Sequence, residues 1–262
     1  MEKAQVITDA ELLSEYAKKF TEEPAAVIET QAPSSSSVTL LAGVEINDEL
    51  VTEVEIRELN GADEEAIAKS GSLGKSLNTI LTRGVVKFGD TKATPEITDR
   101  MVSGDRDLVM LAIRKLTFGN TVESELTCQM CGERTHVSLD LDKDIPVRQF
   151  SGEWVWDVST KRGVIRVTIP TGSTQKKLMD NQASTSAELS TLLLSECIVS
   201  VDGLPVVPYR VALELGIQDR ENLLKTIMDN IPGPRLVEVT TACEACGEVI
   251  STPLSLASLF RL

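Results

Sequence analysis

The chain has 262 residues, of which 42% are hydrophobic and 25% are charged, and its formal net charge is −14. That length fits one large domain or two small ones, and no apolar run approaches the roughly 20 residues of a membrane-spanning helix. The acidic balance and the aromatic content of only 3% argue against nucleic acid and carbohydrate as direct ligands, because both are bound through basic or aromatic surfaces.

The N-terminal segment, residues 1–47, is predicted to be an amphipathic helix on a flexible linker. Thr8 and Glu11 form a capping-box pattern at the start of a helix over residues 7–20. The apolar stripe of this helix is a candidate partner-binding surface, formed by Leu12, Leu13, Tyr16 and Phe20. Residues 21–38 contain two prolines and the run Ser34–Ser37, a composition typical of a linker. The helix either packs on its own protein or docks into a groove of a partner.

Residues 48–145 form a first predicted α+β repeat. Its expected elements are a strand at Val51–Leu59, helices at Asp63–Lys69 and Leu73–Leu81, a strand at Val85–Phe88 and a helix at Asp105–Thr117. The segment Ser124–Thr127 then leads into Cys128-Gln129-Met130-Cys131-Gly132, and His136–Leu141 follows as a strand. This pattern predicts that the two cysteines lie on the turn of a β-hairpin.

Residues 146–262 form a bridge with two tryptophans and a second predicted repeat. Its expected elements are a strand at Val164–Ile169, helices at Ser173–Asp180 and Ala187–Ser195, a strand at Cys197–Val201 and a helix at Asp219–Asn230. Leu236–Thr241 leads into Cys243-Glu244-Ala245-Cys246-Gly247, and Val249–Pro253 leads out. We expect Trp154 and Trp156 of the bridge, Pro146–Lys161, at the joint between the repeats, because large amphipathic rings suit such interfaces.

The two repeats match in the type and order of their elements. The spacing of corresponding residues drifts only from 112 for Leu77 and Leu189 to 115 for Cys128 and Cys243. We therefore predict an α+β fold with a tandem, pseudo-symmetric duplication of a helix-rich unit that carries a zinc-knuckle β-hairpin.

The four paired cysteines, Cys128, Cys131, Cys243 and Cys246, are the candidate metal ligands. Structural zinc prefers four tetrahedral protein ligands, and two cysteines two residues apart reach one ion from a tight turn. The glycine after each pair permits the backbone conformation that such a turn needs. The two pairs are 111 residues apart, a separation that the duplication explains because equivalent turns of two halves would meet at one ion. The expected cofactor is therefore one structural zinc ion.

Three other interpretations of these cysteines remain open. Disulfides are disfavoured in cytosol, which is the expected compartment because the sequence begins without the basic segment and apolar core of a secretory signal. A redox Cys-x-x-Cys normally lies at a helix N-terminus, whereas strands are predicted here. His136 is an alternative ligand close to Cys131, and Cys197 lies in an apolar run as an expected core thiol.

Signatures of catalytic sites, such as a phosphate-binding loop or a Gly-x-Ser-x-Gly turn, are otherwise missing from the sequence, so we expect no enzyme.

The first repeat resembles the baseplate-hub family of contractile-tailed bacteriophages over roughly residues 50 to 145. The resemblance rests on Val54–Leu59 with the acidic helix start Ala62–Glu65, on Ser103–Asp107 with the helix that follows, and on Phe118–Asn120 before the first cysteine pair. The second repeat keeps the layout but departs from these motifs.

The resemblance implies a structural or assembly component without catalytic residues. It would be assembled in the host cytoplasm and would lie in the virion tail or baseplate. Its partners would be other hub and tail-tube proteins, with the tape measure as a further candidate, and it would be one of several copies in an assembly. The main alternative is a zinc-ribbon adaptor for nucleic-acid or transcription machinery, which the acidic balance opposes. An enzyme with an unrecognised site is the third hypothesis.

Overall fold

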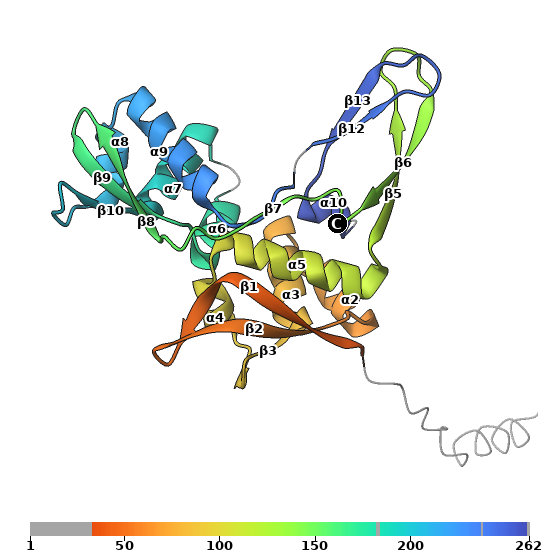
Figure 1. Ribbon diagram of the computed structural model, residues 1–262, viewed down its shortest axis with the longest axis horizontal. Coiled ribbons are helices and arrows are strands. Elements are labelled where there is room, and N and C mark those ends of the chain that lie inside the picture. Colours follow the sequence, from red (N-terminus) through yellow and green to blue (C-terminus); the bar gives the residue numbers. More distant parts are fainter. Residues whose placement is uncertain (1–32, 182–183, 237, 261–262) are drawn as a thin grey trace, which may run out of the picture. The chain divides into compact units, whose positions relative to one another are not determined.

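The computed structural model describes residues 33–181, 184–236 and 238–260 (Figure 1). The predicted helix with Leu12, Leu13, Tyr16 and Phe20 lies outside these residues. Within them, helices alternate with small antiparallel sheets, which confirms the predicted α+β class.

The first region contains a four-stranded sheet covered by helices and ends in a β-hairpin. Its elements are β1 (Ser35–Ile46), β2 (Glu49–Arg57), α2 (Gly61–Ala68), α3 (Leu73–Gly84), β3 (Val85–Phe88), β4 (Thr91–Lys92), α4 (Pro95–Arg100), α5 (Ser103–Phe118), β5 (Thr121–Thr127) and β6 (Arg134–Asp140). The sheet order is β1-β2-β3-β4, and β5 pairs with β6. In α3, Leu77, Ile80 and Leu81 follow helical spacing and are buried against the cluster that contains Phe88 and Ile113.

The second region has, among its described residues, a three-stranded sheet, five helices and a second hairpin. Its elements are β7 (Val147–Arg148), β8 (Val155–Thr160), β9 (Gly163–Thr168), α6 (Gly172–Asp180), α7 (Ser186–Cys197), β10 (Ile198–Val201), α8 (Pro208–Glu214), α9 (Ile217–Asn230), β11 (Gly233–Pro234), β12 (Glu238–Ala242), β13 (Val249–Pro253) and α10 (Leu256–Leu259). The sheet order is β10-β9-β8, so each strand pairs with its neighbour in sequence. Cys197 is fully buried in this region's core, as expected.

Several elements differ from the sequence prediction. The expected linker over residues 21–38 is wrong from Ser35 onward, because Ser35–Ile46 is the strand β1, paired with β2. Cross-strand hydrogen bonds give the serine run this role, with the Ser37 hydroxyl donating to Glu53 at 2.6 Å. The short helices α4 and α8 and the strand β8 were not predicted. Both helices begin at a proline, Pro95 and Pro208, which is favourable at the first helical position but reads in sequence as a break.

Each region fixes the start of its longest helix through a buried aspartate. Asp105, the third residue of α5, accepts hydrogen bonds from three main-chain amides of Leu41–Gly43 at 2.8–3.0 Å. Burial raises the pKa of its carboxyl, and the three amides counteract this effect. Asp219, the third residue of α9, accepts a hydrogen bond from the amide of Lys161 at 3.2 Å. The aspartate at the third position of each helix thus ties the helix start to the main chain of an earlier segment in the same region.

The arginine after each aspartate ties the helices of its region together. Arg106 donates to the carbonyl of Thr98 in α4 at 2.7 Å, and Arg220 donates to the carbonyl of Ala212 in α8. Both acceptors lie eight residues before the arginine. Each guanidinium also hydrogen-bonds a side chain of the long helix that precedes it, α3 or α7.

The two regions meet where the start of α6 packs on α4 and α5. The Ser103 amide donates to Pro170 at 2.9 Å and the Gly172 amide donates to Met101 at 2.9 Å. Lys176 bonds Asp99 at 2.6 Å. A small apolar cluster shared by both regions completes the joint, formed by Ala42, Val102, Ile169, Phe150, Trp156 and Ile231.

The tryptophans differ in position. Trp156 packs in the shared cluster, as expected for a residue at the joint, and also against the core of the second region. Trp154 is 41% exposed and instead meets the edge of the Phe150 ring, with ring centroids 4.9 Å apart.

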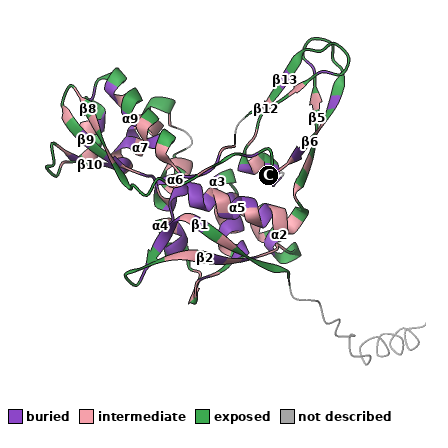
Figure 2. Cartoon of the chain, viewed as in Figure 1, coloured by how far each residue is buried: buried purple, intermediate pink, exposed green. Residues whose placement is uncertain are grey.

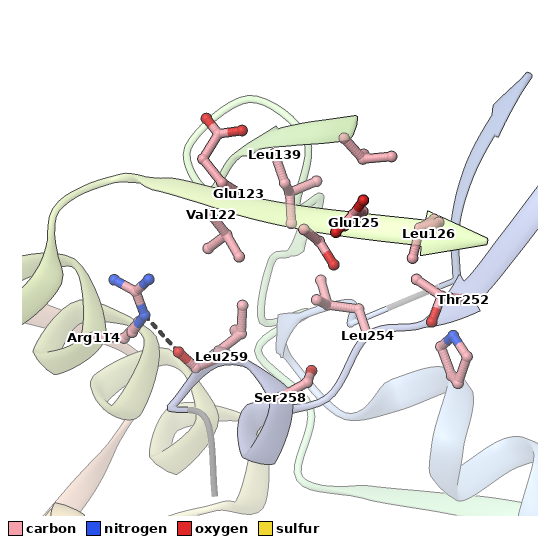
Figure 3. Close-up of a pocket in the computed structure, with 13 residues that line it drawn as sticks. Arg114, Val122, Glu123, Glu125, Leu126, Leu139, Thr252, Leu254, Ser258 and Leu259 are labelled. Carbon is pink, nitrogen blue, oxygen red and sulfur yellow. Dashed lines mark hydrogen bonds between the residues drawn. The ribbon is translucent and has the colours of Figure 1, made fainter. Parts of the chain in front are cut away.

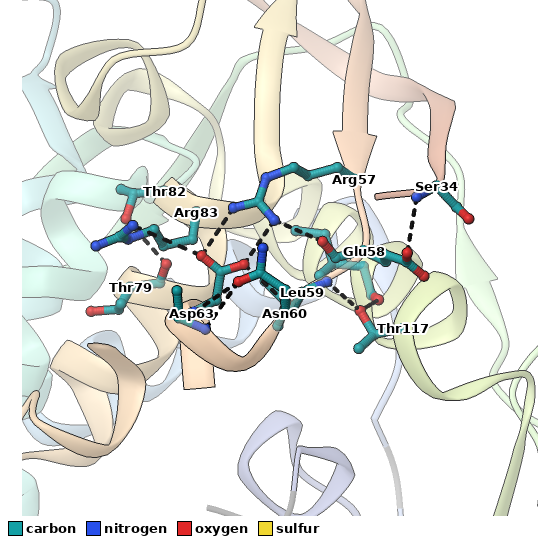
Figure 4. Close-up of polar contacts among 12 residues, drawn as sticks. Ser34, Arg57, Glu58, Leu59, Asn60, Asp63, Thr79, Thr82, Arg83 and Thr117 are labelled. Atoms are coloured by element: carbon teal, nitrogen blue, oxygen red, sulfur yellow. Dashed lines mark hydrogen bonds and ion pairs between the residues drawn. The ribbon is translucent and has the colours of Figure 1, made fainter. Parts of the chain in front are cut away.

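The corner between β2 and α2 is held by buried charge (Figure 4). Arg57 forms a bidentate salt bridge with Asp63, with hydrogen bonds of 2.7 and 2.9 Å, and the Asp63 side chain is only 2% exposed. The Asn60 side chain caps α2 by accepting from the Asp63 amide, and the Asn60 amide in turn donates to the Asp63 carboxylate. Burial acts to raise the pKa of Asp63, but Arg57 and the Asn60 amide outweigh it and hold the pKa below its ordinary value. These bonds explain why the motif that carries the family resemblance has this arginine and this aspartate.

Asp107 gives the joint a measurable pH dependence. Burial raises the pKa of this carboxyl to about 6, against the hydrogen bond from Gln175 and the nearby positive charge of Arg106, which both favour the ionised form. Between pH 4 and 6 the folded protein therefore binds this proton more tightly than the unfolded chain, so its stability falls as pH rises through that window. Relative to the wild type, the free energy of unfolding of Asp107→Asn should be about 2 kcal/mol higher at pH 7 than at pH 4, measured by urea unfolding at both pH values.

Asp157→Asn is the control for this prediction. Hydrogen bonds from Arg166 lower the pKa of Asp157, so its removal should change the pH dependence in the opposite direction. Equal pH dependence for the wild type and Asp107→Asn would contradict the prediction.

Candidate metal centre

Two hairpins of the same construction carry the cysteine pairs. β5 and β6 pair from Thr121 with Asp140 to Thr127 with Arg134, and β12 and β13 pair from Glu238 with Pro253 to Ala242 with Val249. In the first turn the Cys128 amide donates to Glu133 at 2.8 Å, and in the second the Cys243 amide donates to Glu248 at 2.8 Å. Both hairpins are largely exposed or intermediate along their length (Figure 2).

The glycine after each pair has the conformation that the turn requires. Gly132 has φ 76° and Gly247 has φ 74°, in the left-handed region that side-chain-bearing residues rarely adopt. The amides of these glycines donate to the carbonyls of Cys128 and Cys243 at 2.9 Å. The sequence pattern Cys-x-x-Cys-Gly therefore folds into the same turn twice.

The two turns bring all four predicted ligands together. The sulfur atoms of Cys128, Cys131, Cys243 and Cys246 lie within 4.8 Å of one another. The Cys128 and Cys246 sulfurs are 3.7 Å apart, and those of Cys131 and Cys243 are 3.6 Å apart. One cysteine of each pair is buried and the other exposed, so the cluster lies at the surface with one side closed.

The donor set and its spacing fit a tetrahedral ion. Zinc–sulfur bonds of about 2.3 Å in a tetrahedron place the sulfurs roughly 3.8 Å apart, close to the two cross-hairpin distances. The amides of Cys246 and Ala245 lower the pKa of the Cys243 thiol to about 6. The Glu248 amide also favours the Cys246 thiolate, but the three neighbouring thiols outweigh it and raise its pKa to about 12. A bound cation would relieve this crowding of sulfurs. The group can hold a metal ion.

The rival interpretations find less support in the geometry. None of the cysteines in the described part of the chain is in a disulfide. Both pairs lie on strand–turn–strand segments, not at helix N-termini. His136 lies in β6 opposite Glu125 and is not part of the sulfur cluster.

The cluster has little apolar support of its own. Cys128 and Cys243 pack with Ile250 and, at the edge, Leu126, while Met130 at the first turn is 75% exposed. So small a core cannot hold two turns together by burial alone. A metal ion would be the main bond between the hairpin tips.

Below the tips, a groove of about 380 Å³ lies between β5, β13 and α10 (Figure 3). Its apolar lining includes Val122, Leu254 and Leu259, and Arg114 donates from Nε to the Leu259 carbonyl at 2.6 Å. The two carboxylates on its rim have partners within the first hairpin: Ser138 bonds Glu123 at 2.8 Å, and Arg134 lies 3.6 Å from Glu125. These contacts give the carboxylates a structural role.

Two small α+β regions bring four thiols together in a cluster that can hold a metal ion. A family model described as T4 bacteriophage base plate protein matches residues 44–206, which is more than half of the chain. The chain therefore belongs to this family of phage baseplate proteins, and the resemblance found in the sequence is confirmed. No curated protein and no solved structure matches the chain.

Family membership indicates a structural baseplate component of the phage tail that interacts with other tail components. The matched segment includes the first cysteine pair and ends at residue 206, before the second pair. Among the helices that the structure describes, none has the length and apolar character needed to cross a bilayer.

Proposed function

We propose that the protein is a structural or assembly component of the baseplate hub, built around one zinc ion bound by Cys128, Cys131, Cys243 and Cys246. The observation that supports this most directly is the convergence of two Cys-x-x-Cys-Gly turns, 111 residues apart in sequence, on one cluster in a chain of the baseplate family. Four thiolates leave no open coordination position, so the ion would be structural.

The hub protein would consist of a duplicated unit behind an N-terminal arm. The predicted boundaries are residues 1–47, 48–145 and 146–262, but β1 (Ser35–Ile46) pairs with β2, so the first repeat includes β1 and the arm ends before it. Three similarities support the duplication. Both regions have the order hairpin, two helices, strand, two helices, hairpin, and both sheets pair in sequence order. The buried aspartate–arginine pairs at the starts of α5 and α9 make corresponding bonds. The two cysteine turns share every main-chain bond described above.

The protein would act by binding hub and tail-tube proteins, with the tape measure as a further candidate partner, after assembly in the host cytoplasm. The N-terminal stripe of Leu12, Leu13, Tyr16 and Phe20 would supply one contact, since apolar helix faces commonly dock into partner grooves. The chain's net charge of −14 opposes the alternative of direct nucleic-acid binding.

Complementation of a phage that lacks this protein tests the proposal. We expect the wild-type chain to restore tail assembly, and a variant with serine at Leu12, Leu13, Tyr16 and Phe20 to lose at least about tenfold in particle yield while keeping one zinc per chain, because burial of four apolar side chains is worth several kcal/mol. Serine at the exposed Leu50 and Leu73, which lie outside the stripe, is the control. Normal virions in the absence of the protein would refute the hub function.

A further inference from the structure

The joint between the two regions is formed by two unlike surfaces, one from each region. The second region contributes a docking segment, Pro170–Lys176, and the first region contributes a receiving face, Asp99–Asp107. If the regions are repeats, the first region also has a docking segment and the second region also has a receiving face, and the internal joint uses neither of them. The first region's docking segment is Leu59–Glu65, since Asn60 and Thr171 precede α2 and α6 with the same capping arrangement. The second region's receiving face is Leu213–Glu221, since Asp105 and Asp219 are both third in their helices.

These two remaining surfaces are exposed. In the internal joint Val102 and Ser103 are 3% and 6% exposed, whereas Leu213 is 58% exposed and Ile217 is 77% exposed. A side chain added at Gly172 would collide with Arg106, but one added at the corresponding Gly61 would meet nothing within 4 Å. The second region thus presents an apolar face at the place where the first region holds its neighbour.

The main-chain groups of the two surfaces are also complementary. The internal joint is an isolated β-bridge between Val102 and Thr171, made by the amides of Ser103 and Gly172. The corresponding groups make no hydrogen bond among the described residues; they are the Leu215 carbonyl, the Ile217 amide, the Leu59 carbonyl and the Gly61 amide. A bridge of the same kind would pair all four.

Side-chain size raises no obstacle to the contact. Met179 lies so close to Gly74 that a side chain there would clash, whereas the corresponding residues, Ala68 and, counted from the starts of α3 and α7, Ala187, are both small. Lys176 bonds Asp99 and also interacts with Glu96.

In the corresponding surfaces the charges are reversed. Glu65 replaces Lys176, and Arg210 lies on the receiving side, one helical turn before Leu213. Each has an exposed local partner, Lys69 at 2.9 Å and Glu214 at 2.8 Å, so the contact would exchange these surface ion pairs. One pair opposes the contact, because Glu64 would face Glu221 where the internal joint places Gln175 beside Asp107.

We propose that a second copy of this chain docks its Leu59–Glu65 corner on the Leu213–Glu221 face, in the manner of the internal joint. This proposal rests on the proposed duplication. The bond of Arg57 to Asp63 holds the docking corner rigid in advance, which lowers the entropy lost on association (Figure 4). The contact joins unlike surfaces, so it continues from copy to copy and closes into a ring or extends as a chain.

Sedimentation velocity of the purified, zinc-loaded full chain over a concentration series tests the contact. We expect mass to rise with concentration, and Leu213→Asp to weaken association by about tenfold or more, since a buried leucine contributes roughly 1.5–3 kcal/mol. Leu50→Asp is the matched control, because Leu50 is 61% exposed and lies outside both surfaces. Glu221→Gln should strengthen association by removing the repulsion from Glu64.

Charge reversal identifies the partner surfaces. Arg210→Glu and Glu65→Arg should each weaken self-association. Mixed in equal amounts, they should co-assemble in alternation with one-to-one composition, because the altered receiving face of one matches the altered corner of the other and their two unaltered surfaces still match. A monomer at every concentration up to the solubility limit, association unchanged by Leu213→Asp, or failure of the mixture to co-assemble would each overturn the proposal. Zinc content and phage complementation are measured separately, so these results leave the hub function to its own test.

Discussion

Removal of the metal from the four-cysteine site should lower the melting temperature by about 10–20 °C. Cys131 and Cys243 enclose 111 residues, and closing a loop of that order contributes roughly 4–5 kcal/mol through the entropy of the unfolded chain. In a protein of this size each kcal/mol shifts the melting temperature by about 2–4 °C. Calorimetry with and without a strong chelator, together with elemental analysis that gives one zinc per chain, measures the effect.

The loss should begin at the hairpin tips. Cys128 and Cys243 have only Ile250 and Leu126 as apolar neighbours there, whereas the two main cores contain none of the four ligands. Hydrogen exchange should therefore accelerate in β5, β6, β12 and β13 while α3 and α9 keep their protection.

Two cysteine variants separate the metal's contribution from that of a buried thiol. Cys246→Ser should eliminate the difference between chelated and untreated protein. Cys197→Ala should keep that difference, because Cys197 lies in the core of the second region, away from the cluster. Two zinc ions per chain, or a chelator effect that persists in Cys246→Ser, would contradict a shared site.

The cluster could be predicted because its information is local. Each Cys-x-x-Cys-Gly fixes its own turn, and the repeated order of elements indicates that two such turns come from equivalent places. The long helices were predictable for the same reason, since Leu77, Ile80 and Leu81 show helical spacing within one segment.

Elements that depend on distant partners could not be predicted in this way. Ser35–Ser37 resemble a linker in composition, and only their pairing with β2 makes them a strand. The joint between unlike surfaces could not be predicted either, because the predicted pseudo-symmetric duplication suggests that equivalent surfaces of two halves meet. The bonds of Ser103 to Pro170 and of Lys176 to Asp99 show that unlike surfaces meet instead. The sulfur cluster relates the turns symmetrically, but the bodies of the two regions are not related in that way.

Gly104→Ala should destabilise the protein by on the order of 3–5 kcal/mol, because it forces the two regions apart. A Cβ at this position would collide with the carbonyl oxygen of Pro232, which is main chain and is held in place by the strand β11. Gly233 approaches from the other side with φ 117° and would collide with Gly104 if it carried a side chain. Neither backbone can move without opening the joint.

The expected sign is opposite to that of helix propensity. Gly104 is the second residue of α5, and alanine in a helix is favoured over glycine by about 1 kcal/mol. Gln218 holds the corresponding place in α9 and is exposed, so Gln218→Ala should change stability by no more than about 0.5 kcal/mol. Urea unfolding of the two variants compares the same helix position with and without a neighbour. A Gly104→Ala protein as stable as the wild type would mean that Pro232 does not contact α5, and the main-chain support of the joint would reduce to the bonds of Ser103 and Gly172.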